Sequence, residues 1–206
     1  MRGTLSVLGS FAVGCLLGYC FDMRQTAHDI SMWVLYALMF QVGIGLGANK
    51  DLKAILSSVR PSTLLLPVAT VSGTLLLTAL VSPLLSGWSM TDCMAVGSGF
   101  AYYSLSSVLI TQLKEASAGL QVATELGAIA LLANIFREMI TLVAAPILSR
   151  YLGAKALISA AGVTSMDVLL PTIVSRSGSG VMPAAVVHGV LIDMSVPVLV
   201  TFFCSL

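Results

Sequence analysis

Long runs without a charged residue dominate this sequence and restrict what it can fold into. Residues 3–21, 30–49 and 61–85 contain no Asp, Glu, Lys or Arg. A helix that crosses a bilayer needs about 20 mostly apolar residues. Composition agrees, because 57% of the residues are hydrophobic and only 9% are charged, against roughly 25% charged in a soluble domain. The sequence therefore predicts an all-α polytopic membrane protein.

We expect one transmembrane domain over residues 1–206, with a two-helix N-terminal unit at 1–60 and a core at 61–206. About five full spans are expected. They lie at residues 3–21, 30–49, 61–85, 122–148 and 181–206. Residues 50–60 mix polar and apolar positions and predict a surface helix at the membrane interface.

Two further segments, 93–113 and 156–174, are predicted to be broken or re-entrant helical hairpins. Both are rich in glycine and hydroxyl residues, which weaken a helix and supply hydrogen-bonding groups. Non-helical backbone at membrane depth is tolerated only where protein buries it or where it lines a wet cavity. The N-termini of such half-helices can hold a carboxylate, although packing through small residues, with no ligand, stays open.

The basic residues set the expected topology. If both segments are hairpins, seven basic residues lie on the cytoplasmic side and two outside: Arg2, Lys50, Lys53, Arg60, Arg150, Lys155 and Arg176 against Arg24 and Lys114. If both cross fully, the count becomes six against three. The positive-inside rule favours the hairpins, with the N-terminus cytoplasmic and the C-terminus external. Two hairpin-plus-span units of opposite orientation would form an inverted-repeat transporter core.

An adjacent charged pair, Arg137-Glu138, lies near the middle of the apolar stretch 126–148. A charge at that depth costs a few kcal/mol and marks a functional-site hypothesis. Neighbouring helix positions point about 100° apart, so the two side chains do not easily pair with each other. Glu138 lies one turn after Asn134 and is expected to face the path of a cationic substrate or a proton. Arg137 is expected to anchor the scaffold, with Asp167 as a distant partner.

The remaining candidates are polar residues of the broken segments and the last span. Asp167 follows Ser165 by two residues, and His188 and Asp193 lie five apart before Pro197. For His188, packing and function both stay open. The predicted substrate- or proton-binding set is Glu138, Asn134, Asp167, Ser165, Thr164, Ser104, Ser106, Ser107, Gly97, Gly99, Gly162 and His188.

Other classes of function are disfavoured. Four cysteines form no CxxC motif and the two histidines are far apart, so no metal site is expected. The basic residues form no cluster, so nucleic acid is not an expected partner. GxSxG and HExxH motifs do not occur, and enzymatic function is not expected. No cofactor is predicted beyond a coupling proton.

Several phrases in combination resemble one known family. They are Gly97-SGFAYYSLSSVLIT-Gln112, Leu131-LANIFREMITLVAAPIL-Leu148, Ala161-GVTSMDVLLP-Thr172 and Val181-MPAAVVHG-Val190. Together they resemble the LysO-type lysine exporters of bacteria. The resemblance implies a cytoplasmic (inner) membrane carrier that expels L-lysine and lysine-like cationic analogues, with Glu138 as the chief functional carboxylate. Exchange of lysine for protons is a further hypothesis.

The resemblance also raises an expectation about partners. Single-chain members carry an additional N-terminal portion with a second intramembrane acid, and this sequence starts after that portion. We therefore expect a short companion membrane protein or, alternatively, a homodimer. Two other functions stay open: a carrier for another small solute with a coupling cation, and a non-transporting subunit of a membrane complex.

Overall fold

The computed structural model describes residues 61–206 and, singly, Val13, Trp33 and Phe40. The predicted spans 3–21 and 30–49 and the surface helix 50–60 lie outside the described residues. The chain divides into two compact units, Met1–Ala48 and Asn49–Leu206. All helices described below belong to the second unit.

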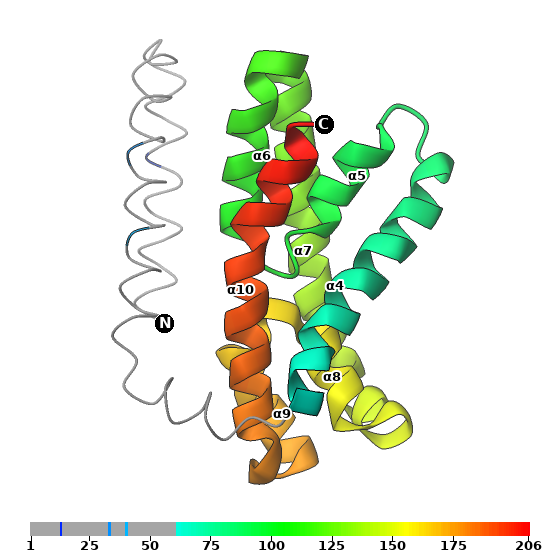
Figure 1. Cartoon of the computed structure of the whole chain (residues 1–206), viewed down its shortest axis with the longest axis vertical. Helices are drawn as coiled ribbons and strands as arrows, with labels where there is room; N and C mark the ends of the chain where they lie inside the picture. The colour runs from blue at the N-terminus through cyan, green and yellow to red at the C-terminus, as the bar shows by residue number, and fades with distance from the viewer. Residues whose placement is uncertain (1–12, 14–32, 34–39, 41–60) are drawn as a thin grey trace. The chain divides into compact units, whose positions relative to one another are not determined.

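Every regular element in residues 61–206 is helical, which confirms the all-α prediction for this part of the chain. The α-helices are α4 (Pro61–Val81), α5 (Met90–Gly97), α6 (Tyr103–Ala118), α7 (Leu120–Ile147), α8 (Gly153–Ala161), α9 (Leu170–Ser177) and α10 (Met182–Cys204) (Figure 1). Short 3₁₀ turns occupy Ser82–Leu84, Gly162–Met166 and Ser179–Val181, and a π turn occupies Leu148–Leu152.

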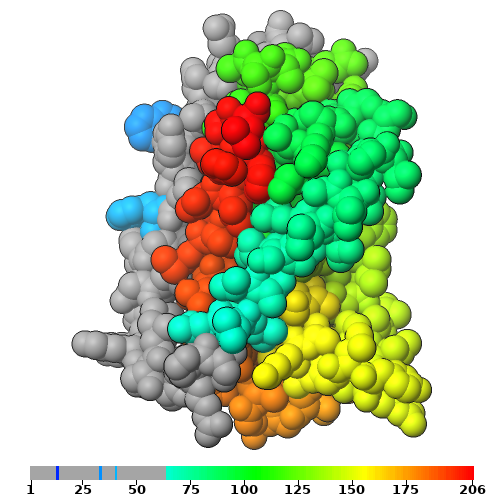
Figure 2. Space-filling model, turned by 45° about the vertical axis from the view of Figure 1, so that its right-hand side comes forward, coloured from blue at the N-terminus to red at the C-terminus, as the bar shows by residue number. Residues whose placement is uncertain are grey.

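Three stretches of the described chain are long and apolar enough to cross a membrane: Leu64–Leu84, Leu120–Met166 and Ser179–Cys204. They overlap the expected spans at 61–85, 122–148 and 181–206, and the second also runs on into the segment 156–174 that was predicted to be broken. Outward-facing leucines of α4, such as Leu76 and Leu80, are 65% and 72% exposed, and α4 lies across one face of the unit (Figure 2). Such an apolar face suits contact with lipid or with further protein.

Both segments predicted to be broken are interrupted. In the first, α5 ends at Gly97 and α6 begins at Tyr103; in the second, α8 ends at Ala161 and α9 begins at Leu170. In Figure 1, α5 and α6 occupy the upper part of the unit, whereas α8 and α9 occupy the lower part. Each broken segment therefore turns back towards the end from which it came. Re-entry into a membrane and the total number of spans stay predictions.

The two breaks contact each other at the centre of the unit. The backbone N–H of Val163 donates to the carbonyl of Phe100 at 2.9 Å. Phe100 and Ala101 are buried and have φ values of 44° and 72°, a backbone region that non-glycine residues seldom adopt. Gly162, at φ +63°, is in direct contact with the Phe100 carbonyl, and a Cβ atom there would overlap it. This contact between residues 100–101 and 162–163, called the crossing below, is thus a packed backbone contact that requires glycine at residue 162.

An apolar cluster packs around the two half-helices that flank the second break. Ala145 of α7, Leu157 and Ile158 of α8, Ile173 of α9 and Ala185 of α10 are all buried in it. Burial of such side chains stabilises a fold by about 25 cal/mol per Å² of apolar surface. In a bilayer that term is weaker, and close packing contributes more. The cluster fixes the positions of both half-helices relative to α7 and α10.

The contact at the crossing predicts a difference between two glycine substitutions. Gly162 and Gly119 both have φ values suited to glycine, but only Gly162 has neighbouring atoms where a Cβ would lie. Gly119→Ala should therefore destabilise the fold by about 1–3 kcal/mol of backbone strain, and Gly162→Ala should add a packing penalty of about 1–3 kcal/mol. Thermal unfolding of the two purified variants in the same detergent measures the difference. Equal melting temperatures would show that the backbone contact contributes little.

Candidate functional site

One face of α7 holds both breaks. Asn134, Arg137 and Thr141 lie three or four residues apart, so they share a face of the helix. Asn134 bonds to the first break, while Arg137 and Thr141 bond to the carbonyl of Ala160 at the end of α8. The part of α7 that carries the Arg137-Glu138 pair therefore also supplies the side chains that bond to both breaks.

Asn134 is a clamp on the first break. Its Oδ1 accepts from the N–H of Ala101 at 2.8 Å, and its Nδ2 donates to the carbonyl of Ala130 at 2.8 Å and to Ser106 Oγ at 3.4 Å. The residue is 3% exposed. Gly99 lies directly against this amide, where a Cβ would overlap it. The side chain predicted to contact substrate is thus occupied in holding the unwound backbone.

Arg137 has backbone partners at the second break. Its Nε and Nη2 donate to the carbonyls of Ala160 and Ser159, each at 3.1 Å, and its guanidinium lies 5.5 Å from the ring centre of Phe100. The last carbonyls of a helix lack helical partners and carry its negative dipole end, so the cation stabilises the end of α8. This agrees with an anchoring role. The expected partner Asp167 is not in contact, because the carbonyls left open by the break hold the guanidinium instead.

Glu138, one helix turn after Asn134, makes none of these contacts. It is half-buried, and its Oε2 is buried without a hydrogen-bond partner among the described residues. The charge of Asp167, an exposed residue after the second break, acts on it electrostatically. A buried carboxylate oxygen without a partner is costly unless a ligand or a proton satisfies it. The geometry therefore leaves Glu138 open to a cation.

A closed hydroxyl–imidazole cluster surrounds the second break. His188 is fully buried, with Nδ1 3.1 Å from Ser165 Oγ and Nε2 2.9 Å from Thr70 Oγ1. Thr70 Oγ1 also lies 2.7 Å from Ser159 Oγ, and Thr164 Oγ1 donates to the carbonyl of Ala161. These contacts join α4, α8 and α10. Three predicted site residues, Thr164, Ser165 and His188, thus find their partners within the protein.

The serines of the first break differ in accessibility. Ser106 is buried and donates to the carbonyl of Tyr102 at 2.8 Å, whereas Ser104 is exposed and Ser107 is half-buried. No side chain caps the N-terminus of α6 at Tyr102. The N–H groups of its first turn, beside Ser104, therefore remain available to an anionic ligand.

The sequence reading missed a row of threonines on α4. Thr70, Thr74 and Thr78 recur every fourth residue and so share a face. Thr70 contacts His188, Thr74 Oγ1 accepts from Arg137 Nη1 at 3.5 Å, and a Cβ on Gly97 would lie 2.7 Å from Thr78 Oγ1. The spacing was the signal that could have identified them.

A pocket of about 350 Å³ opens between α4, α5 and α7. It extends from Trp88 and Leu85 to Asn134 and Arg137, and most of its wall is apolar. Pockets that hold small molecules have volumes of about 300–1,000 Å³. Arg137 is the charged group that this pocket reaches.

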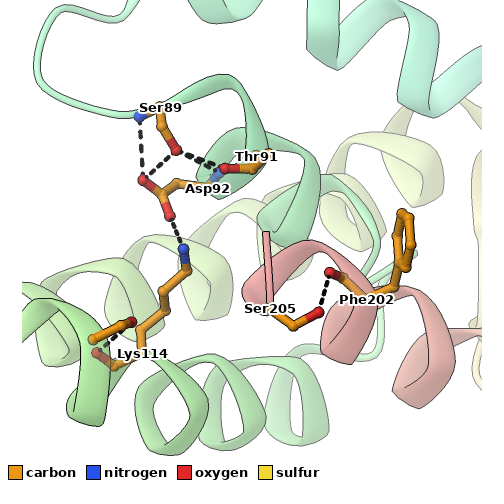
Figure 3. Close-up of polar contacts among 7 residues, drawn as sticks. Ser89, Thr91, Asp92, Lys114, Phe202 and Ser205 are labelled. Carbon is orange, nitrogen blue, oxygen red and sulfur yellow. Dashed lines mark hydrogen bonds and ion pairs between the residues drawn. The ribbon is translucent and has the colours of Figure 1, made fainter.

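An ion pair joins the start of α5 to the end of α6 (Figure 3). Lys114 Nζ lies 2.7 Å from Asp92 Oδ1, and Asp92 also accepts hydrogen bonds from the N–H and Oγ of Ser89 in a capping box. Burial alone would raise the pKa of Asp92, but the bonds from Lys114 and Ser89 outweigh it and lower that pKa below its ordinary value. The first broken segment is therefore closed at the end away from the crossing.

Comparisons with known proteins converge on one family. The family model described as lysine exporter LysO matches residues 8–204. The lysine exporter LysO of Escherichia coli K12 is 33% identical over 200 residues, which are 97% of this chain but 62% of that protein. A putative lysine exporter of Haemophilus influenzae is 30% identical over 201 residues, 97% of each chain. No solved structure matches significantly.

The clamp on the first break leads to a stability prediction. Asn134→Ala leaves the buried N–H of Ala101 without its acceptor, which should cost about 1–3 kcal/mol. Thr124→Ala is a matched control on the same helix, because Thr124 is exposed and its hydroxyl bonds only to the carbonyl of Leu120. Thermal unfolding of the purified variants should show a lower melting temperature for Asn134→Ala alone. Similar melting temperatures for the two variants would show that the hydrogen bond from Ala101 to Asn134 does not stabilise the fold.

The Asp92–Lys114 pair predicts a pH dependence. Because the folded pKa of Asp92 is depressed, the stabilisation is present above the unfolded pKa of about 3.9 and is lost as the pH falls through the folded value. Asp92→Asn should therefore flatten the acid side of the stability curve relative to the wild type, with little change in slope near neutral pH. Melting temperatures from about pH 6 to pH 3 measure this. Parallel curves for both proteins would contradict it.

Proposed function

The chain belongs to the lysine exporter LysO family, and on this basis we propose that it is a secondary transporter that exports L-lysine across the bacterial cytoplasmic membrane. The observation that carries the proposal is the buried Glu138 Oε2, which has no hydrogen-bond partner in the described part of the chain. An intramembrane acid without a resident cation suits a site that binds a cation in passing. Export of lysine-like cationic analogues follows from the same chemistry.

The charged groups of lysine match the backbone N–H donors and the carboxylates found near the two breaks. Lysine carries one carboxylate and two ammonium groups, so its site needs N–H donors as well as acids. The uncapped first turn of α6, with Ser104 and Ser107 nearby, offers donors, and Glu138 and Asp167 offer acids. Half-helix N-termini recur at the anion sites of transporters with broken helices.

Coupling to protons would use the same carboxylate. Glu138 can hold a proton or an ammonium group but not both, so each would displace the other. Exchange of an outgoing lysine for an incoming proton then needs no further cofactor. This step rests on the unpaired state of Glu138 and on its position beside the two breaks.

The crossing of the two breaks supports the inverted arrangement expected from the sequence. We propose that 93–113 and 156–174 enter the membrane from opposite sides, with the N-terminus cytoplasmic and the C-terminus external. Broken segments that meet in this way are typical of alternating-access carriers. A companion membrane protein, or a second copy of the chain, would complete the assembly, and the exposed leucines of α4 offer a face for it.

One observation favours a second candidate. Arg137 lines the 350 Å³ pocket and forms no ion pair with a carboxylate among the described residues. A carrier for an organic anion with a coupling cation would use this guanidinium as its anion site. Uptake assays with lysine, arginine, ornithine and dicarboxylates in the same vesicles separate the two candidates.

The lysine proposal predicts the effect of removing one charge. Glu138→Gln should reduce lysine export at least tenfold, because the amide cannot hold a proton or pair with an ammonium group. Glu125→Gln is the matched control, since Glu125 is exposed on the same helix and bonds only to Gln121. Export is measured as efflux of labelled lysine from cells without their own exporter, with protein levels compared by immunoblot. Normal efflux by the Glu138→Gln variant would refute the assigned role.

A further inference from the structure

We propose that Asp193 is a second substrate-binding carboxylate, which together with Glu138 receives the two ammonium groups of a dibasic amino acid. The inference rests on the proposed function and deepens it. Asp193 lies within the last apolar span, and its relation to the second break follows only from the packing of α10.

Helix α10 carries Asp193 to the crossing. Ala185, Gly189 and Asp193 are four residues apart and share one face of the helix. The carbonyl of Ala185 accepts from Ser165 Oγ at 2.9 Å, and a Cβ on Gly189 would lie 2.6 Å from the Cβ of Met166. The first two positions thus pack against the second break. Asp193, one turn further along, continues that face beyond it.

No cation in the described part of the chain pairs with Asp193. The residue is 5% exposed, and no hydrogen bond or ion pair satisfies its carboxylate there. Arg137 is held by the carbonyls of α8, and both ring nitrogens of His188 contact hydroxyl groups. Asp193 is therefore largely buried and has no partner among the described residues, and a bound cation or a proton would stabilise it there.

The backbone at the same position adds an acceptor. In an α-helix the carbonyl of residue 193 would accept from the N–H of residue 197. Residue 197 is proline and has no N–H. The Asp193 carbonyl therefore lacks its usual donor, and a cation held by the carboxylate can also contact this oxygen.

Asp193 and Glu138 share a common neighbour. Asp167 interacts electrostatically with both of them, and Tyr102, at the start of α6, interacts with Asp193 and Asp167. Asp167 lies just before α9 and Tyr102 just before α6, whereas Arg137 bonds to the C-terminal end of α8. Like charges that interact in this way repel one another unless cations intervene. A ligand with two ammonium groups can neutralise two of these carboxylates at once, whereas a neutral amino acid such as norleucine offers one.

Thermal stabilisation by ligand tests the proposal on the purified full-length chain. Lysine should raise the melting temperature of the wild type more than norleucine does. Asp193→Asn should weaken the apparent lysine affinity about tenfold or more and bring it close to that for norleucine, while Asp193→Glu keeps a measurable preference for lysine. Glu125→Gln should respond to lysine like the wild type.

The melting temperature without ligand distinguishes a binding role from a structural one. Replacing an unpaired buried carboxylate by an amide should leave the unliganded protein as stable as the wild type or more stable. A fall in that temperature together with an unchanged lysine affinity would show that Asp193 is structural and would overturn the proposal. Weaker lysine binding by Asp193→Asn, with an unliganded melting temperature equal to or above that of the wild type, supports it. If the wild type does not respond to lysine either alone or together with its companion membrane protein, both this inference and the proposed function are refuted.

Discussion

The contact between the two helix breaks is the constraint on which the rest of the structure depends. One backbone hydrogen bond, from Val163 to Phe100, joins segments more than sixty residues apart in sequence. It can form only because Gly162 has no side chain. Interrupting two helices leaves open backbone groups, and in a bilayer each must find a partner within the protein. Asn134 and Arg137 on one face of α7 provide those partners.

The same contacts separate opposite charges at the centre. Arg137 occupies the carbonyl end of α8, where a cation is stabilised by the helix dipole. Glu138 lies about 100° round α7 from Arg137, and the charge of Asp167 acts on it electrostatically. The two adjacent charged residues thus have different roles. Arg137 stabilises the crossing, and Glu138 stays available to a ligand. Because Arg137 and Glu138 belong to the same turn of α7, a shift of this helix would change the contacts at the breaks and the surroundings of Glu138 together.

Much of the fold could be predicted from the sequence. The apolar runs gave the expected positions of α4, α7 and α10, and the glycine and serine clusters gave the two interruptions. The candidate site was less predictable. Asn134, Ser165 and His188 were recognised as polar residues in apolar surroundings, but their partners lie on other helices, and no spacing within one segment reveals them. The threonines of α4 went unnoticed because a hydroxyl every fourth residue is also common in helices that pack without function.

By itself the sequence determined that the chain is membrane-embedded, that the part from residue 61 onwards is helical, where its helices are interrupted, and which residue types lie at membrane depth. These follow from local rules: the length of apolar runs, the conformational freedom of glycine and the cost of a charge away from water. Only the tertiary structure decided which polar groups are satisfied and which stay open. Asn134 and Glu138 lie one turn apart and look equivalent in sequence, yet one is bonded to the break and the other has a bare oxygen. That difference depends on what α5, α6 and α8 bring to α7, and hydrogen bonds between distant segments are fixed only when the chain packs.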